Sequence, residues 1–208
     1  MKKNSPFINI SLSFALLVPF QGRLAYGIIL LIMLNTVMAA ATASRKIVSI
    51  TGLNGLHEVI TGLVVISTTL ILRSMLVLYS PAIALTLGNA VYLTGVCSYF
   101  VSALYKKECV SLKDELKFNL RKTGLWSIYG FCFFLFRDII AFGTVSFPCP
   151  SGIFEFTLMP EASRIFFAGT FFATIPGAVI LVALTHSVHS FLIDRTTFFR
   201  LREAHNAL

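Results

Sequence analysis

Long runs of apolar residues dominate this chain and restrict it to the folds of membrane proteins. The sequence has 208 residues, of which 56% are hydrophobic and only 12% carry a charge. Soluble domains carry about 25% charged residues, and a helix that spans a membrane needs about 20 consecutive apolar residues. The length allows roughly six such helices with short connections. We therefore predict one polytopic membrane domain over residues 1–208, in contact with the lipid bilayer.

Six apolar segments are separated by charged residues, glycine or proline. They are Phe7–Phe20, Leu24–Ala43, Val59–Tyr79, Ala82–Leu104, Leu125–Phe147 and Ile165–Ile193. The first is short and ends at Val18-Pro19-Phe20, and the fourth is interrupted by Gly88 and Asn89. Such short or interrupted segments favour a half-helix or a broken helix. We expect an all-α fold with six transmembrane helices, of which the first and fourth are short or broken.

The segments between the apolar runs also carry structural predictions. Arg45 and Lys46 are expected to end the second helix, and the charged stretch Tyr105–Thr123 is amphipathic enough to lie along the membrane surface. Pro148–Arg164 is predicted to be a loop that closes the fifth helix. The sixth segment contains Pro176-Gly177, which predicts a kink because proline cannot donate the backbone hydrogen bond of a helix interior.

The distribution of positive charge predicts the orientation of the helices. With six spans, thirteen of the 17 lysine and arginine residues fall on the side that holds both termini. Positively charged residues concentrate in cytoplasmic loops, so both termini are predicted to be cytoplasmic. The net charge of +8 is accordingly interpreted as a topology signal and as contact with anionic lipid, with no nucleic acid as partner.

The order of the segments also suggests an internal repeat. Residues 7–80 and residues 81–194 each contain one short or interrupted segment followed by two longer ones, and residues 195–208 form a polar cytoplasmic tail. Three spans in each half force the halves into opposite orientations in the membrane. We expect two inverted three-helix repeats, an arrangement that often encloses a binding site near mid-depth.

Arg137 and Asp138 stand side by side in the apolar run FCFFLFRDII and are the main candidate site residues. A charge within a membrane helix is costly and normally faces protein or water. Adjacent helical residues point about 100° apart, so each charge needs a partner other than its neighbour, and Arg73 is a candidate partner for Asp138. The pair could belong to an ion path or a subunit interface, or it could fix helix packing. It could also lie near the outer interface if the fifth helix begins earlier.

Other patterns give little indication of chemistry. Cys97, Cys109, Cys132 and Cys149 follow no metal-binding spacing, and two of them lie in apolar runs, where cysteine usually packs as a small residue. His186 and His189 share a helix face, but no other histidine lies in a span, so a hydrogen-bonded role is favoured over a metal site. The sequence contains no phosphate-binding glycine loop and no nucleophile motif of a hydrolase.

Two stretches of the C-terminal half resemble the Rnf/Nqr family of six-span membrane subunits, closest to its RnfE/NqrD type. The matching residues are Gly130-Phe131, Phe136-Arg137-Asp138-Ile139-Ile140, Phe142-Gly143-Thr144, Ile175-Pro176-Gly177-Ala178 and Leu192-Ile193-Asp194. The resemblance implies a non-catalytic subunit of an ion-translocating electron-transport complex in the bacterial inner membrane. It also implies a sister six-helix subunit as partner, with flavin and iron–sulfur centres in the partner subunits.

The chain departs from that family at the two positions where cysteines help to hold an iron–sulfur cluster. Val18 in Leu17-Val18-Pro19-Phe20 and Ala90 in Gly88-Asn89-Ala90 stand at these positions. Neither side chain can supply the thiolate that a cluster needs, so we expect no cofactor in this chain. The candidates for an ion path or a subunit interface remain Arg137, Asp138, Arg73 and Asn89. The alternative function is a small transporter, or a component of another transport assembly, that has lost redox work; a scaffold without transport is a third option.

Overall fold

The computed structural model describes residues 17–52, 54–104, 112–158, 169–188 and 191. The chain is mostly helical, and one β-hairpin interrupts the helices. The elements are α2 (Leu24–Thr51), η1 (Asn54–Leu56), α3 (His57–Tyr79), α4 (Pro81–Leu87), η2 (Gly88–Val91), α5 (Tyr92–Leu104), α6 (Leu112–Phe142), β1 (Thr144–Cys149), β2 (Gly152–Thr157) and α8 (Gly169–Ala173), followed by an unlabelled helix, Ile175–Val188. Within the described residues, four helices are long and apolar enough to cross a membrane: Leu24–Thr51, His57–Tyr79, Pro81–Tyr99 and Leu112–Phe142.

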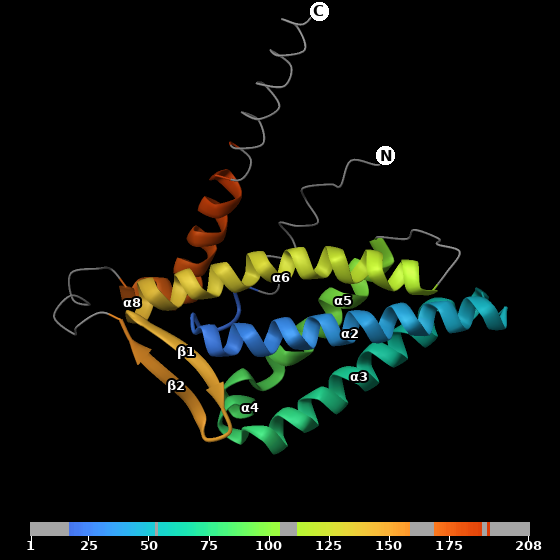
Figure 1. Cartoon of the computed structure of the whole chain (residues 1–208), viewed down its shortest axis with the longest axis horizontal. Coiled ribbons are helices and arrows are strands. Elements are labelled where there is room, and N and C mark those ends of the chain that lie inside the picture. The colour runs from blue at the N-terminus through green and yellow to red at the C-terminus, as the bar shows by residue number, and fades with distance from the viewer. Residues whose placement is uncertain (1–16, 53, 105–111, 159–168, 189–190, 192–208) are drawn as a thin grey trace, which may run out of the picture.

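The antiparallel pair α2 and α6 forms the centre of the molecule. Figure 1 shows the two helices side by side, with α3 on the opposite side of α2. Close approach of α2 and α6 depends on glycine, because a Cβ atom on Gly27 would lie 2.4 Å from the ring of Phe134. Gly130 of α6 meets Leu31 of α2 in the same way. In the most apolar 18-residue stretch of α2, 67% of the residues are buried, a larger share than in the other three long helices described.

Helix α2 is longer than the sequence indicated. It continues through Arg45 and Lys46 and ends at Thr51, followed by Gly52 in the left-handed conformation with φ of 75°. Lysine and arginine are good helix formers, so a charge that marks the end of an apolar run does not end the helix itself. A glycine with positive φ is the usual helix stop, and this signal lies within the TGLNG stretch expected to form the loop.

The fourth apolar segment is a broken helix, as predicted. Helix α4 ends at Leu87, a short 3-10 turn covers Gly88–Val91, and α5 begins at Tyr92. Gly88 has φ of 51° and ψ of −130°, a conformation open to glycine and strained for other residues. The break therefore has a local cause in the sequence.

Helix α6 differs from the prediction at both ends. It begins at Leu112, so the charged stretch expected to lie on the membrane surface continues directly into the fifth apolar segment. It ends at Phe142, five residues before the predicted end, because Gly143 takes a φ of 62° and turns the chain. Its 31 residues give a length of about 46 Å. The sequence prediction divided one helix into a surface segment and a span.

A β-hairpin replaces both the end of the predicted fifth helix and the start of the predicted loop, in a fold that is otherwise helical as predicted. Strands β1 and β2 pair antiparallel from Thr144↔Thr157 to Cys149↔Gly152. Pro148 lies within β1 and pairs with Ile153, where the missing N–H of proline is tolerated at the margin of a short sheet. Phe147, assigned to the end of the fifth helix, lies in β1, and Phe154 and Phe156, assigned to the loop, lie in β2.

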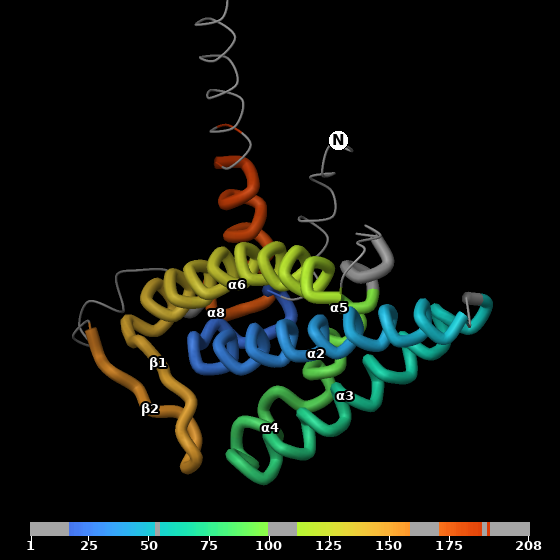
Figure 2. The backbone as a smooth tube through the Cα atoms, turned by 45° about the vertical axis from the view of Figure 1, so that its right-hand side comes forward, coloured from blue at the N-terminus to red at the C-terminus, as the bar shows by residue number. Residues whose placement is uncertain are grey.

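The C-terminal segment is also broken, close to the predicted kink. Helix α8 ends at Ala173, Thr174 forms a bend, and the helix Ile175–Val188 follows with Pro176 in its first turn. Gly177 fits closely under this bend, since a Cβ atom there would lie 2.2 Å from the carbonyl oxygen of Phe171. In Figure 2 the helix Ile175–Val188, in red, projects away from α6 at a steep angle, whereas the prediction had it as a sixth parallel span. The first segment, Phe7–Phe20, lies outside the described residues except for its end from Leu17 onward.

Candidate functional site

Arg137 and Asp138, the charges singled out in the sequence, lie in the last two turns of α6 and are fully buried. The guanidinium group of Arg137 donates five hydrogen bonds, and every acceptor is a backbone carbonyl oxygen. Its Nε bonds to Phe172 at 2.9 Å, its Nη1 to Phe20 at 2.7 Å and Leu17 at 3.2 Å, and its Nη2 to Ala173 at 3.1 Å and Thr174 at 3.3 Å.

These carbonyl groups belong to two places where the chain leaves a helix. Phe172 and Ala173 are the last residues of α8, and Leu17 is a helical residue followed by the turn at residues 18–20. The last four carbonyl groups of a helix have no partner within it and carry the negative end of the helix dipole. Arg137 therefore stabilises two broken ends at once, supplying both the missing donors and a compensating positive charge.

Asp138 performs the opposite task at the beginning of α2. The N-cap residue of α2 is Arg23, whose side chain makes no capping hydrogen bond. Instead, Oδ2 of Asp138 accepts a hydrogen bond from the backbone N–H of Leu24 at 3.1 Å. A carboxylate at this position satisfies a free N–H group and interacts favourably with the positive end of the helix dipole.

Strand β1 extends this cap. The backbone N–H of Ser146 donates to Oδ2 of Asp138 at 2.8 Å, and its hydroxyl donates to the same oxygen at 2.5 Å. The Ser146 hydroxyl in turn accepts the N–H of Ala25 at 3.1 Å, and Thr144 donates to Oδ1 of Asp138 at 3.3 Å. One carboxylate thus joins α6, α2 and the hairpin. We call Arg137, Asp138 and the backbone groups they bind the charge junction.

The two adjacent charges have different partners, as the helical geometry predicted, but the proposed Arg73–Asp138 contact is wrong. Arg73 of α3 donates from Nη1 to the hydroxyl of Tyr92 at 2.6 Å, and its guanidinium carbon lies 5.3 Å from the centre of that ring. The contact ties α3 to the start of α5, just after the break at Gly88. Arg73 is half-buried, whereas Arg137 is fully buried.

Glycine and a second arginine complete the surroundings of the charge junction. A Cβ atom on Gly22 would lie 2.9 Å from Nε of Arg137, so the chain passes close to the guanidinium group. Arg23 pairs with Glu155 of β2, and its guanidinium carbon lies 4.4 Å from the centre of the Phe142 ring. The hairpin is thereby held to the adjoining ends of α2 and α6.

Neutral polar contacts continue along the interface of α2 and α6. The Asn35 amide donates to the Ser127 hydroxyl at 2.7 Å, and the Asn119 amide donates to the Thr42 hydroxyl at 3.2 Å. From Leu24 to Asn35 and from Asp138 to Ser127 the chain covers the same 11 residues, about three helical turns. The contacts therefore follow one antiparallel register. Hydrogen bonds of this kind between membrane helices contribute on average about 0.6 kcal/mol each.

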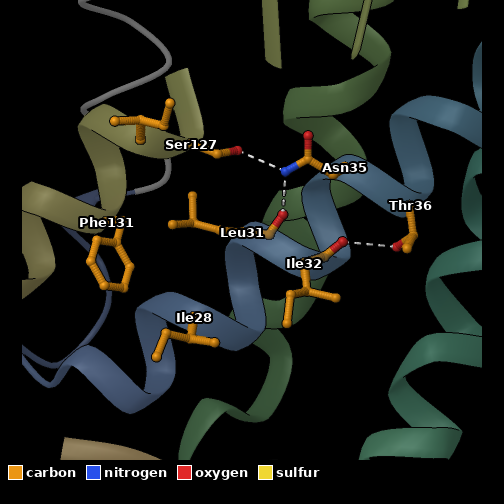
Figure 3. A pocket seen from close by; sticks show the side chains of 8 residues that line it. Ile28, Leu31, Ile32, Asn35, Thr36, Ser127 and Phe131 are labelled. Carbon is orange, nitrogen blue, oxygen red and sulfur yellow. Dashed lines mark hydrogen bonds between the residues drawn. The ribbon is translucent and has the colours of Figure 1, made fainter. Parts of the chain in front are cut away.

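An open apolar groove of about 560 Å³ lies beside this interface (Figure 3). Its lining residues come from α2 and α6: Ile28, Leu31, Ile32, Asn35, Thr36, Ser127, Ile128 and Phe131. The Asn35 amide is engaged by Ser127 and by the carbonyl group of Leu31 at 2.7 Å, as Figure 3 shows. The groove offers a surface to hydrocarbon, and its charge-free lining gives an ion no favourable place to bind.

The remaining predicted residues are separated from the charge junction. Val18 is buried in the main hydrophobic core, and Ala90 packs against the same core. Asn89 is exposed on the short turn η2.

Among the described residues, no group of three or more His, Cys, Asp or Glu side chains could hold a metal ion. Cys97 is buried, Cys149 is half-buried and Cys132 is exposed, while Cys109 and His189 lie outside the described residues.

Sequence reasoning missed Ser146 and Thr144, because both were assigned to the end of a helix. It also missed the backbone partners of Arg137, since carbonyl groups occur at every position and leave no signal in a sequence. The available signals were the nearby glycines and prolines, which mark helix ends but do not say which side chain binds them.

Comparison with protein-family models, curated proteins and solved structures gave no match to this chain. The resemblance to the Rnf/Nqr family therefore stays a prediction that rests on the motifs described above. What the fold supports directly is a helical membrane protein in contact with the bilayer, with its charged residues gathered at the ends of helices.

Proposed function

We propose that this chain is a non-catalytic membrane subunit of an ion-translocating electron-transport complex of the Rnf/Nqr kind. In this proposal it lies in the bacterial inner membrane with both termini in the cytoplasm. It packs against a sister six-helix subunit, and partner subunits carry the flavin and iron–sulfur centres. The proposal includes six spans in two inverted three-helix repeats, with α2 and α6 as the second helix of each repeat.

The observation that carries the proposal is that one arginine binds carbonyl groups of residues 17–20 and of the end of α8 and the bend after it. Arg137 lies in the strongest resembling motif, and its partners belong to the first segment and to the Pro176-Gly177 segment. Three of the regions that carry the family resemblance, or depart from it, therefore lie close together, whereas Gly88-Asn89-Ala90 lies apart from them. The antiparallel course of α2 and α6 agrees with inverted repeats, and the broken segment Pro81–Tyr99 is the expected start of the second repeat.

Within such a complex, Arg137 and Asp138 have a positioning role in place of the ion path considered from the sequence. Each side chain is fully buried and already bound to several backbone groups or hydroxyls. A side chain that passes ions must exchange its hydrogen-bond partners. Here each exchange would leave a backbone group at a helix end without a partner in an apolar environment, which costs about 1–3 kcal/mol of free energy for each group. The subunit thus offers a rigid frame on which partner subunits pack.

Purification in mild detergent tests the complex. A tagged chain, expressed from its native genome, should copurify with a second small polytopic subunit and with flavin and iron. The iron should persist when all four cysteines are replaced by serine, because we expect the cluster ligands in partner chains. Recovery of a colourless, single-component protein from membranes that contain it at native levels would overturn the proposal. Loss of iron in the cysteine-free variant would overturn the assignment of the cluster to the partners.

A second candidate function, a small transporter, is favoured by the helix break at Gly88. Broken membrane helices expose backbone groups that bind substrates and coupling ions, and here the break presents Asn89 on its exposed side. Purified chain in liposomes should then support solute or ion flux without partners, and Asn89→Ala should reduce it. Asp138→Asn provides a comparison: an intact protein with reduced cation-coupled flux would return Asp138 to an ion path, whereas unchanged flux supports its structural role.

A further inference from the structure

The β-hairpin has two chemically different faces. The register places Val145 opposite Phe156 and Phe147 opposite Phe154 on one face, and Ser146 opposite Glu155 on the other. The polar face is turned to the helix ends, since Ser146 binds Asp138 and Glu155 pairs with Arg23. On the opposite face Val145 packs against the main hydrophobic core, and the phenylalanines beyond it are exposed.

Three aromatic side chains on that face are strongly exposed. Phe147 is 46% exposed, Phe154 is 60% exposed and Phe156 is 58% exposed. We call these three phenylalanines the aromatic face. Each Phe buries at least about 150 Å² when it is covered, so leaving all three in water would cost several kcal/mol at about 25 cal/mol per Å².

The length of α6 places the hairpin at the boundary of the bilayer. Apart from the buried pair Arg137 and Asp138, the charged residues of α6 end at Lys122, and the 20 residues from Thr123 to Phe142 extend about 30 Å. This is the thickness of the hydrocarbon core. With the charged turns of α6 outside the hydrocarbon at one surface, its C-terminal end reaches the other surface. The hairpin begins two residues later, at Thr144.

The hairpin lies beside membrane helices that also carry exposed apolar side chains. Strand β2 contacts α4, and Figure 1 shows the hairpin beside this helix. Leu85 of α4 is 83% exposed, and Leu78 at the end of α3 is 86% exposed. These residues lie on helices that contact the bilayer, so the hairpin extends the lipid-facing surface at its margin.

The open strand edges exclude a deeper position. The sheet has two strands among the described residues, so backbone N–H and C=O groups along the outer edge of β2 lack a strand partner there. Hydrocarbon does not tolerate such an open edge. The boundary between headgroups and acyl chains supplies both requirements, water and headgroups for the edge and acyl chains for the phenylalanines.

We propose that the β1–β2 hairpin is a membrane-interface anchor, with the aromatic face inserted among the lipid acyl chains just below the headgroups. Its occupant is lipid, at the bilayer surface reached by the C-terminal end of α6. The anchor holds the charge junction at a fixed depth, because the polar face of the same hairpin binds Asp138 and Arg23. The proposal depends on bilayer contact and not on the identity of any complex.

Tryptophan fluorescence in liposomes tests the anchor. The chain contains a single tryptophan, Trp126, so Phe154→Trp and, separately, Phe147→Trp would be made in a Trp126→Phe background. Ile66→Trp, at a 59% exposed position in the middle of α3, is the matched control for the bilayer interior. Phosphatidylcholine vesicles would carry bromine either high on the acyl chains, close to the headgroups, or close to the chain ends.

The hairpin tryptophans should be quenched at least twofold more strongly by the high bromines than by the deep ones, and Ile66→Trp should show the reverse order. Strong quenching by aqueous iodide without lipid quenching would overturn the proposal, because the aromatic face would then lie in water. Stronger quenching by deep bromines would also overturn it. Fluorescence that neither the high nor the deep bromines quench would show that lipid does not contact the aromatic face, and would also overturn the proposal. The same order of quenching at both hairpin positions would show that the result does not come from a local change caused by one substitution.

Discussion

The two ends of the α2–α6 pair are held together by different chemistry. At the end that adjoins the hairpin, Asp138 caps α2 and Arg137 binds five carbonyl oxygens, and both are fully buried. Toward the other end the contact is a neutral hydrogen bond between Asn119 and Thr42. Charges lie where helices begin or end, and neutral groups suffice where the helices run uninterrupted. The difference indicates that broken helices, more than helix pairing, require buried charge in this protein.

The largest expected effect comes from removing the charge at the broken ends. Arg137→Met keeps the side-chain volume similar but leaves five carbonyl groups without their donor, which should destabilise the protein by about 3–5 kcal/mol. The midpoint of unfolding by sodium dodecyl sulfate, followed by circular dichroism, measures this loss. Arg137→Lys is the control and should retain part of the stability, because an ammonium group can reach fewer carbonyls. Equal stability of Arg137→Met and the wild type would show that the charge junction contributes nothing.

Removal of the cap on α2 should have the next largest effect. Asp138→Ala leaves the N–H groups of Leu24 and Ser146 without an acceptor and should cost about 2–3 kcal/mol. Asp138→Asn retains an acceptor oxygen and loses only the charge, so it should cost about 1 kcal/mol. The same unfolding experiment compares the two variants. If both were equally destabilised, the charge and not the hydrogen bonds would dominate the cap.

A third comparison concerns the middle of the pair. Gly27→Ala places a methyl group 2.4 Å from the Phe134 ring and should destabilise the protein by about 1–3 kcal/mol. Gly124→Ala in α6 is its matched control, because a Cβ atom there has no neighbour within 4 Å. That variant should be neutral or stabilised by up to about 1 kcal/mol through helix propensity. Equal unfolding midpoints for the two variants would contradict close packing at Gly27.

The smallest effect is expected at the neutral end. Asn119→Ala removes the hydrogen bond to Thr42 and should cost about 0.6 kcal/mol, and Asn35→Ala should cost a similar amount. Unfolding midpoints again give the values. A loss at Asn119 as large as that of Arg137→Met would remove the distinction between the two ends on which the comparison rests.

The second, third and fifth apolar segments could be located from the sequence because each lies largely within one long helix. The predicted span Val59–Tyr79 agrees with α3 within two residues, and the small residues around Gly88 correctly indicated a broken helix. Helix ends were less certain. Arg45 and Lys46 mark the end of an apolar run, but α2 continues to Thr51. The same reasoning failed at Leu112, where α6 begins among charged residues.

The hairpin and the charge junction could not be predicted for a physical reason. Residues 144–147 continue an apolar run whose pattern does not distinguish a helix from a short strand, and Phe154 and Phe156 follow prolines that predicted a loop. Burial of Arg137 and Asp138 was expected, but their partners are main-chain groups that the tertiary fold brings together. Arg73 was chosen for Asp138 because it is a charge, whereas the fold satisfies Asp138 with N–H and hydroxyl donors.

The partners of Arg137 also constrain the order in which the chain can be completed. Its acceptors come from residues 17–20, which are synthesised before α6, and from residues 172–174, which are synthesised after it. A ribosome-bound chain that has released α6 but not α8 therefore holds a guanidinium group with only the early acceptors in place. Closure of the structure must await the final segment, so a truncated translation product would present an incompletely neutralised charge to membrane quality-control proteases.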